Sequence, residues 1–348
     1  MKMLNEHARK ICLTPELSGV GGMVSFQRKL IIGMRARGIE TSFDLSDDEC
    51  DSILVIGGTR HLAALRKANR RGARIVQRLD GINWVHRQSS TGPRHWLRAE
   101  YGNRLLATIR KGIADHIVYQ SEFVRKWWQT KYSNPQISSN VIHNGVDLAH
   151  FNDAGKGQPS QGRLRLLLVE GSLMGGYEFG LDTAVHLAER IALDQNQEVE
   201  LVVAGRVSAE QKEMWSQKSA VKIEWKGLVS QDDLPALYRS AHLLYSADLN
   251  AACPNAVIEA MACGLPVVAF DTGALAELLN KDAGILADYG ADPWKLESPD
   301  IPGLAHAAME VLDNQDRFRA GARARAEEAF GLDQMVAAYL DVLRPQNG

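Results

Sequence analysis

Residues Leu243 to Gly273 read LLYSADLNAACPNAVIEAMACGLPVVAFDTG. The segment begins with a β-prone apolar run and passes through a polar loop to Pro254, a residue suited to the first turn of a helix. An apolar helical stripe follows and stops at Gly264 and Pro266. The next apolar run, Val267–Phe270, is expected of a strand buried on both faces of a parallel sheet. This order of strand, loop, helix and strand predicts an α/β fold that binds ligands beyond the carboxyl ends of its strands.

Glu259 lies one turn inside the predicted helix. Free N–H groups at the start of a helix attract phosphate, so a carboxylate at this depth can reach a ribose hydroxyl. The alternative is that Glu259 offsets the helix dipole or faces solvent. Its position alone leaves both interpretations open.

The same alternation of strands and helices extends along the chain and predicts two doubly wound parallel sheets. In the first half we expect strands at Lys10–Leu13, Ser52–Ile56, Arg74–Arg78, His116–Tyr119 and Ser139–Ile142. In the second half we expect them at Leu164–Glu170, Glu198–Ala204, Val221–Trp225, Leu243–Tyr245 and Pro266–Phe270. Helices are predicted at Met23–Arg37 and Thr59–Arg70. A stretch rich in Gly, Pro, Ser and Gln, Asp153–Arg163, separates the halves and is predicted to be a linker.

Composition indicates an ordinary cytoplasmic enzyme. The 348 residues, 45% of them apolar, suffice for two domains. No apolar run reaches the roughly 18 residues that a membrane span needs, and MKMLNEHARK at the start lacks a secretory apolar segment. The four cysteines, Cys12, Cys50, Cys253 and Cys263, form no close metal-type pair, which favours buried, reduced thiols. No cluster has metal-ligand spacing, so no metal is predicted.

Charge is divided unevenly between the halves. Residues 1–150 hold 23 Lys plus Arg against 13 Asp plus Glu, a net of +10, and the rest hold 17 against 29, a net of −12, which together give the total of −2. A basic half suits an anionic partner such as a lipid-linked diphosphate or a membrane surface, and Arg94–Arg110, Trp127 and Trp128 add aromatic residues. The alternative is a solvated basic face with tryptophans half buried against the core. Nucleic acid is not predicted as a partner, because no nucleic-acid-binding motif accompanies the charge.

A glycine loop follows the first predicted strand. Gly19, Gly21 and Gly22 precede a helix, and Asp44 follows a candidate second strand, as in a dinucleotide-binding fingerprint. The fit is poor, because that fingerprint needs glycine where the chain has Val24. A tight turn with positive φ is the other interpretation.

The segment EAMACGLPVVA, from Glu259 to Ala269, resembles the nucleotide-sugar site of family 4 glycosyltransferases. The resemblance extends to LSGVGGM at Leu17–Met23, GIADHIVYQSEF at Gly112–Phe123 and VIHNGVD at Val141–Asp147. It implies the GT-B architecture, in which two Rossmann-like domains face a cleft. We expect an acceptor-side domain at residues 1–152, a nucleotide-sugar-binding domain at 163–330 and a helix in 331–348 that crosses back to the first domain.

The chain departs from the family pattern where two cations usually meet the donor diphosphate. In EGSLMGGYEFG, Glu170–Gly180, Ser172 stands in place of an arginine and Phe179 in place of a lysine. We expect backbone N–H groups of four residues to form an anion-binding nest instead: Gly171, Ser172, Gly175 and Gly176. Arg206 is a candidate cation, or simply a surface arginine.

A second departure precedes the predicted helix. Ala251 stands where a glutamate usually contacts the donor sugar, and Asp248 is the candidate replacement. The N–H groups of Cys253, Asn255 and Ala256 remain able to bind phosphate or sugar oxygens.

In the first half, Asp80 in RLDGINWVHR stands about where the family places a histidine. Asp80 is our candidate for orienting donor or acceptor, and an Asp-Gly turn is the alternative. His86, Asn144 and Gly145, with Gly19, Gly21 and Gly22, are further candidates on the acceptor side. A structural role is the expected one for His143.

The resemblance implies transfer of a sugar, with retention, from a UDP- or GDP-sugar to a glycan or lipid-linked acceptor, with no cofactor, in assembly of a cell-surface polysaccharide, lipopolysaccharide or glycolipid. Asp80 and Glu259 are the candidate catalytic residues. Peripheral contact with an anionic membrane, at the inner face of a cytoplasmic membrane, is a further candidate. A nucleotide-sugar epimerase and a catalytically inactive nucleotide-sugar-binding protein are the alternatives.

Overall fold

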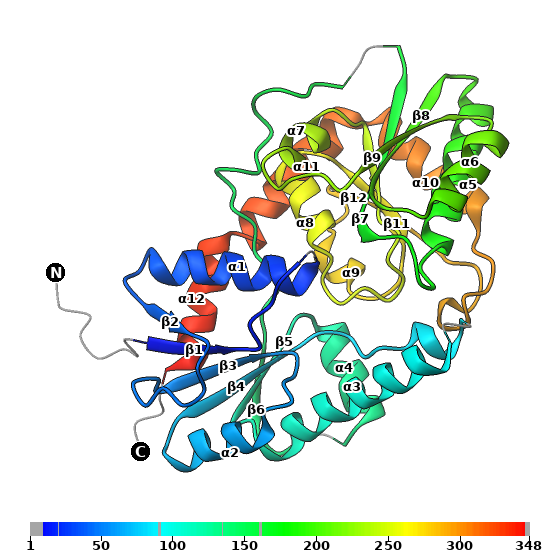
Figure 1. The fold of residues 1–348 in the computed structure, drawn as a ribbon. Helices are drawn as coiled ribbons and strands as arrows, with labels where there is room; N and C mark the ends of the chain where they lie inside the picture. The colour runs from blue at the N-terminus through cyan, green and yellow to red at the C-terminus, as the bar shows by residue number, and fades with distance from the viewer. Residues whose placement is uncertain (1–9, 20, 90–91, 134, 160–161, 345–348) are drawn as a thin grey trace. The chain divides into compact units, whose positions relative to one another are not determined.

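The computed structural model describes residues 10–19, 21–89, 92–133, 135–159 and 162–344. Within them the chain forms two compact units. The first contains residues up to 83, residues 92–145 and residues from 332 onward, and the second contains residues from 84 up to the gap at 90 and residues 146–331. Each unit has its own six-stranded parallel sheet (Figure 1).

The first sheet has the strand order β2-β1-β3-β4-β5-β6. Its strands are β1 (Lys10–Thr14), β2 (Glu40–Ser42), β3 (Ser52–Ile56), β4 (Arg74–Leu79), β5 (His116–Tyr119) and β6 (Ser138–Val141). Its helices are α1 (Gly22–Arg35), α2 (Leu62–Arg70), α3 (Pro93–Gly112), α4 (Glu122–Lys131) and α12 (Leu332–Leu343).

Alternating side chains divide between the two faces of this sheet. Leu54 and Ile56 of β3 pack with α1 and α12 on one face, while Ile53 and Val55 pack with α2 and α3 on the other. At Gly33 of α1, a Cβ atom would come within 2.4 Å of a methyl group of Val336, so the glycine permits the close packing of α12. The last helix of the chain is therefore part of the first unit.

The second sheet has the strand order β12-β11-β10-β7-β8-β9. Its strands are β7 (Leu164–Ser172), β8 (Val199–Arg206), β9 (Lys222–Gly227), β10 (Leu243–Tyr245), β11 (Val267–Phe270) and β12 (Gly284–Ala287). Its α-helices are α5 (Phe179–Gln195), α6 (Ala209–Lys218), α7 (Leu234–Arg239), α8 (Asn255–Ala262), α9 (Leu275–Leu278), α10 (Ile301–Asp313) and α11 (Gln315–Ala329). Two 3₁₀ turns, Val85–Arg87 and Pro293–Lys295, complete the unit.

Helices cover both faces of the second sheet. Residues of α7, α8 and α11 pack on one face and residues of α5 and α10 on the other. The prediction of two doubly wound parallel sheets is confirmed. All ten predicted strands are present, with ends within three residues of those expected, and the helix predicted to begin at Thr59 begins at Leu62.

The division between the units differs from the predicted domain limits. The second unit begins at Val146, because Val146 and Phe151 are buried in its core and the Val146 N–H donates to the carbonyl of Phe330 (2.8 Å). Residues 152–156, where the expected linker begins, are held to this unit, since Arg239 donates to the carbonyls of Asn152 and Lys156. Residues from 84 up to the gap at 90 also belong to the second unit, where Trp84 packs against Trp294 with ring centroids 5.1 Å apart.

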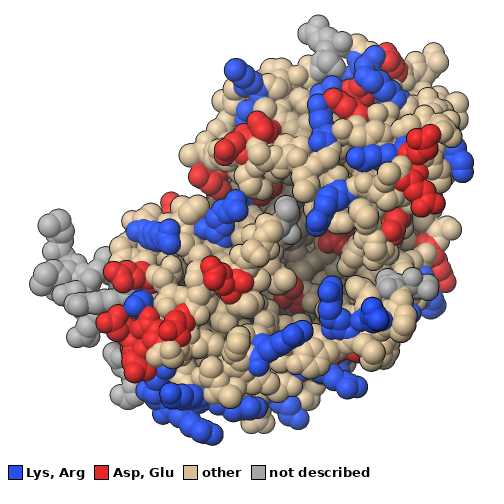
Figure 2. All heavy atoms as spheres, in the orientation of Figure 1, with Lys and Arg blue, Asp and Glu red and all other residues tan. Residues whose placement is uncertain are grey.

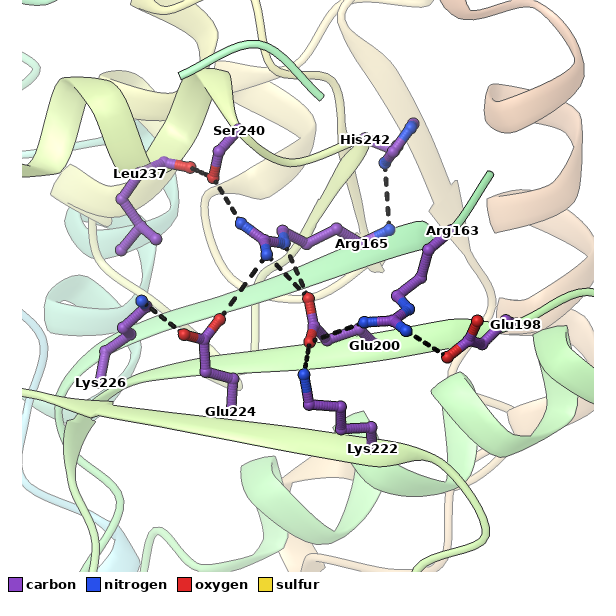
Figure 3. A network of polar contacts seen from close by, with 10 residues as sticks. All are labelled: Arg163, Arg165, Glu198, Glu200, Lys222, Glu224, Lys226, Leu237, Ser240 and His242. Carbon is purple, nitrogen blue, oxygen red and sulfur yellow. Dashed lines mark hydrogen bonds and ion pairs between the residues drawn. The ribbon is translucent and has the colours of Figure 1, made fainter. Parts of the chain in front are cut away.

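Charged residues are neutralised at the amino-terminal edge of the second sheet (Figure 3). Arg165, Glu200 and Lys222 lie opposite one another on β7, β8 and β9. The Glu200 carboxylate accepts from Arg165 Nη2 (2.8 Å) and Lys222 Nζ (2.7 Å). Burial alone would raise the pKa of Glu200, but these two cations outweigh it and lower the pKa. This edge of the sheet is thus stabilised by paired charge.

None of the helices in the described part of the chain combines the length and the apolar character that a bilayer crossing requires.

Candidate functional site

The carboxyl ends of the central strands bring several candidate residues to one edge of the second sheet. Because β7, β8, β10 and β11 are parallel, the loops that follow them leave from the same side. Candidates Gly171, Ser172 and Arg206 lie at the ends of β7 and β8. Asp248 follows β10, and α8 begins a few residues later. The predicted donor-binding edge is therefore assembled within one unit.

The loop before α8 is fixed against the turn that follows β11. Asn250 has φ 55°, and its N–H donates to Thr272 Oγ1 (3.3 Å). The Ala274 N–H donates to the carbonyl of Ala251 (2.9 Å). At Gly273, with φ 64°, a Cβ atom would come within 2.4 Å of the Ala251 nitrogen, so only glycine allows this approach. These contacts fix where α8 begins.

The start of α8 provides backbone donors beside this edge. Pro254 caps the helix, and Asn255 and Ala256 are its first residues. The first N–H groups of an α-helix have no acceptor within the helix. Asn255 and Ala256 are half-buried and Cys253 is buried, so a ligand would meet this site mainly through the first turn of α8.

Glu259 is buried inside the second unit. Its side chain is 3% exposed, which removes the interpretation that it faces solvent. The hydroxyl of Tyr238, from α7, donates to Glu259 Oε2 (3.4 Å). Burial first, and then the charge of Glu259, raises the pKa of Tyr238, which therefore stays a hydrogen-bond donor. The structure thus adds a tyrosine partner that the sequence did not predict.

Part of the predicted glycine nest is filled by the chain itself. The Gly175 N–H donates to Glu178 Oε1 (2.8 Å) and the Gly176 N–H donates to Glu178 Oε2 (2.8 Å). The nest does bind an anion, as its conformation predicts, but that anion is the carboxylate of Glu178 from the same loop. Gly175 and Gly176 are therefore not free for a diphosphate, which corrects the expectation for these two residues.

Arg206 lies beside the position where the family usually has arginine. Arg206 on β8 lies opposite Ser172 on β7, and its Nε lies 3.4 Å from the carbonyl oxygen of Gly171. A Cβ on the preceding Gly205 would come within 2.3 Å of the carbonyl oxygen of Glu170, so the two strand ends approach closely. The exposed Arg206 guanidinium is therefore within reach of a ligand at the end of β7.

Two carboxylates occupy the same edge, and the sequence analysis identified only one of them. Glu170 ends the apolar run of β7, and Asp248 follows the neighbouring β10. Burial, and then the charge of Asp248, raises the pKa of Glu170, while burial raises that of Asp248. Burial and both carboxylates raise the pKa of Tyr177 to about 12. A charged residue directly after six residues of mainly apolar strand, Leu164–Val169, was the signal that could have identified Glu170.

In the first unit, a buried arginine joins two of the candidates. Arg78 Nη1 donates to Asp80 Oδ1 (2.6 Å) and Nη2 donates to Asn144 Oδ1 (2.9 Å). Gln120 also donates to Asp80 Oδ1. The Arg78 guanidinium lies 3.8 Å from the ring centroid of Phe26. Asp80 is therefore the charge partner of Arg78. Neither of the two roles predicted for Asp80, a catalytic carboxylate or part of an Asp-Gly turn, included this ion pair.

The remaining acceptor-side candidates are divided between the two units. Gly145 follows Asn144, and its carbonyl accepts from Lys29 Nζ (3.2 Å). Gly19 and Gly21 have φ of 91° and 141°, as a tight glycine turn requires, and Gly22 begins α1. His86 is buried in the 3₁₀ turn of the second unit, so its expected place in the first domain is wrong.

Across the described ranges there is no group of three or more His, Cys, Asp or Glu side chains suited to a metal ion. The four cysteines are buried and form no disulfide. The ligand chemistry available at the edge of the second sheet is thus backbone N–H donors, one arginine and carboxylates.

A family model of group 1 glycosyl transferases matches residues 165–314, which include all of the β7–β11 edge. A D-inositol 3-phosphate glycosyltransferase of Streptomyces bingchenggensis is 28% identical over 261 residues, which are 66% of this chain and 53% of the relative. A GDP-mannose-dependent α-(1-6)-phosphatidylinositol dimannoside mannosyltransferase of Mycobacterium tuberculosis is 29% identical over 161 residues, or 43% of this chain and 37% of that protein. The chain thus spans about half, or less, of the length of the curated relatives it matches.

Solved structures match the whole fold. The sucrose-phosphate synthase of Thermosynechococcus elongatus superposes with a TM-score of 0.71 at 15% identity, covering 96% of this chain and 98% of that chain. HepE of Anabaena, solved in complex with UDP-glucose, gives a TM-score of 0.67 at 17% identity, covering 95% and 99%. At these identities the likeness establishes two Rossmann-like domains, the GT-B fold. The match to the group 1 glycosyl transferases lies at residues 165–314, within the second of these two domains.

Proposed function

We propose that the protein is a retaining glycosyltransferase that moves a sugar from a nucleotide diphosphate sugar to an acceptor hydroxyl. The observation that carries this proposal is the β7–β11 edge, where the start of α8, Arg206 and Glu259 are assembled within the region that matches the family. A nucleotide sugar needs donors for its diphosphate and an acceptor for its ribose hydroxyls. The start of α8 and Arg206 would meet the first need, and Glu259 the second.

In the reaction, the bond between the anomeric carbon and the diphosphate oxygen breaks while the acceptor hydroxyl bonds to that carbon and loses its proton. The nucleoside diphosphate leaves with increased negative charge, so donors fixed before the reaction lower its barrier. The α8 N–H groups are already held by the contacts of Asn250 and Gly273. Asp80, anchored by Arg78, is our candidate for binding a substrate hydroxyl from the first unit.

The donor is proposed to carry UDP or GDP. HepE was solved in complex with UDP-glucose, and the mycobacterial relative is a GDP-mannose-dependent mannosyltransferase. A glycan or lipid-linked acceptor, in assembly of a cell-surface polysaccharide, lipopolysaccharide or glycolipid, is supported by relatives named for inositol phosphate and phosphatidylinositol dimannoside. Such acceptors would place the enzyme at the inner face of a membrane.

A nucleotide-sugar-binding protein without turnover is the second candidate. It is favoured by one observation, namely that Ser172 and Phe179 replace the usual cations while the same edge carries two carboxyl groups, Glu170 and Asp248. A diphosphate at this edge would meet fewer cations than the family pattern provides.

The test begins with thermal shifts measured with UDP-, GDP- and ADP-sugars. The best binder is then assayed for release of the nucleoside diphosphate, with and without lipid-linked acceptors. Glu259→Gln should abolish most of the binding, whereas Glu310→Gln, on the exposed side of α10, is the matched control. Release that requires acceptor supports transfer. Binding without release under every acceptor would favour the binding protein, and no binding by any nucleotide sugar would contradict both.

A further inference from the structure

The first turns of α3 expose apolar side chains to solvent. Trp96 is 45% exposed, Leu97 63% and Tyr101 51%. Leu97 and Tyr101 are four residues apart and thus share one side of the helix. Three large apolar residues are thus exposed within six positions, in contrast to the single exposed apolar residues found on any protein.

The patch lies among cations. Arg94, Arg98 and Arg104 of α3 are exposed, and Arg60 lies over the ring of Tyr101, 5.7 Å from its centroid. Arg60 begins a segment, 60–71, that holds five Lys or Arg and no Asp or Glu. Figure 2 shows Lys and Arg gathered over α2 in this unit. α2 and α3 pack on the same face of the first sheet, so their charges belong to one basic surface.

The opposite side of α3 is firmly anchored. Asn103 is fully buried, where its Oδ1 accepts from the Asn83 N–H (3.0 Å) and its Nδ2 donates to the Asn83 carbonyl (2.9 Å). Ile109 is fully buried against the sheet. The exposed patch is therefore on a rigid helix rather than on a loop that could fold away.

We propose that this surface, defined as Trp96, Leu97 and Tyr101 with Arg60, Arg94, Arg98 and Arg104, docks the protein on a membrane that contains anionic lipids. This proposal assigns the membrane contact to a specific surface. It rests on the proposed function only in that a lipid-linked acceptor would lie at a membrane. Tryptophan and tyrosine favour the boundary between headgroups and acyl chains. Arginines around them are attracted to anionic headgroups.

Charge favours a bilayer over a second copy of the chain. Two copies meeting at this patch would bring Arg94, Arg98 and Arg104 of one against the same cations of the other. Protein interfaces are depleted of charge at their centre, and like charges there cost affinity. An anionic bilayer complements both the cations and the apolar side chains.

The experiment measures co-sedimentation of the full chain with vesicles of phosphatidylcholine alone and of phosphatidylcholine with phosphatidylglycerol. We expect binding only with phosphatidylglycerol, and weaker binding at high salt. Arg94→Glu/Arg98→Glu should weaken it more than tenfold, since each lost cation changes partitioning by about fivefold. Leu97→Ser/Tyr101→Ser should weaken it about tenfold through lost apolar burial.

A matched control takes one exposed leucine and one exposed lysine from the second unit. Leu193→Ser/Lys218→Glu should change vesicle binding by less than about twofold, because neither residue lies on the basic surface. Circular dichroism checks that each variant is folded. We expect all of them to fold, because every substituted residue is exposed.

Several results would overturn the proposal. Equal binding to neutral vesicles, or full binding by the Arg94→Glu/Arg98→Glu variant, would remove the role of the cations. Loss with the charge variant but not with Leu97→Ser/Tyr101→Ser, together with release by a soluble polyanion, would indicate a polyanion site instead. A dimer that becomes a monomer in the apolar variant would indicate self-association. Nucleotide-sugar thermal shifts on the same preparations keep this test separate from that of the proposed function.

Discussion

At the amino-terminal edge of the second sheet, Glu200 is surrounded by Arg163, Arg165 and Lys222 (Figure 3). At the carboxyl edge, by contrast, Glu170 lies within electrostatic range of Asp248. The first carboxylate has a lowered pKa and the second a raised one. Both edges belong to the same strands, so the difference comes from partners rather than from the fold. Paired charge stabilises the amino-terminal edge. At the carboxyl edge, two like charges repel, so binding of a ligand or a proton there would be stabilising.

Removing Glu200 should have the largest effect on stability. Glu200→Ala leaves Arg165 and Lys222 without their shared carboxylate, and because both cations are partly exposed we expect a loss of about 2 kcal/mol in the free energy of unfolding. Urea unfolding measures this, with Glu224→Ala, a more exposed member of the network, as control at less than about 1 kcal/mol. Nucleotide-sugar affinity should be unchanged. An altered affinity would mean that the two edges are coupled.

The carboxyl edge should make stability depend on pH. Burial and Asp248 raise the pKa of Glu170 to about 8, so between pH 6.5 and 8 the folded chain holds protons that the unfolded chain has lost. Stability should therefore fall as pH rises through this window, by about 1 kcal/mol. His116 and His242, whose pKa values burial lowers, act in the opposite direction at the low end of this window. Their unfolded forms are still half protonated at pH 6.5, so each makes stability rise slightly until those protons are lost.

The variant Glu170→Gln/Asp248→Asn identifies the source of this dependence. It removes both carboxylates and should abolish the fall in stability between pH 6.5 and 8 when the unfolding free energy is measured in urea. A fall that persists in the double variant would assign the protons to other groups.

Arg206→Ala tests whether the carboxyl edge receives negative charge. Arg206 is the cation placed beside Gly171 and Ser172, so its removal should weaken nucleotide-sugar binding by about tenfold while the midpoint of thermal unfolding changes little. Calorimetric titration measures the affinity. Arg190→Ala, at an exposed ion pair on α5, is the matched control. If Arg206→Ala and Arg190→Ala bind the nucleotide sugar with equal affinity, Arg206 does not contact the donor.

The sequence predicted the sheets well because their strands are short apolar runs such as Ser52–Ile56 and Val267–Phe270. It missed β12 as a strand, since Gly284–Ala287 is short and begins with glycine. The start of the second unit at Val146 could not be predicted, because nothing local distinguishes Val146 and Phe151 from surface residues until the core around them is known.

Within the candidate site, the pattern around Glu259 identified the right segment but not the partners. Tyr238 is 21 residues away in the sequence, and its contact with Glu259 depends on how α7 packs against α8. Arg78 is one residue of a buried strand, yet it binds both Asp80 and Asn144, and Asn144 lies 66 positions after it in the sequence. Such contacts are set by tertiary structure and leave no spacing in the sequence that would indicate them.

Glu178→Gln is expected to have the smallest effect, and it tests the chain's own anion in the glycine nest. The amide keeps one oxygen as an acceptor for the Gly175 and Gly176 N–H groups but loses the charge, so stability should change by less than about 1 kcal/mol. A diphosphate at the end of β7 would then meet one negative charge fewer, and nucleotide-sugar affinity should rise about threefold. Glu189→Gln, further along α5, is the control for a general change in charge. Weaker binding in Glu178→Gln would instead mean that the carboxylate holds the loop in the shape that the donor needs, and that this anion supports the site rather than competing with the ligand.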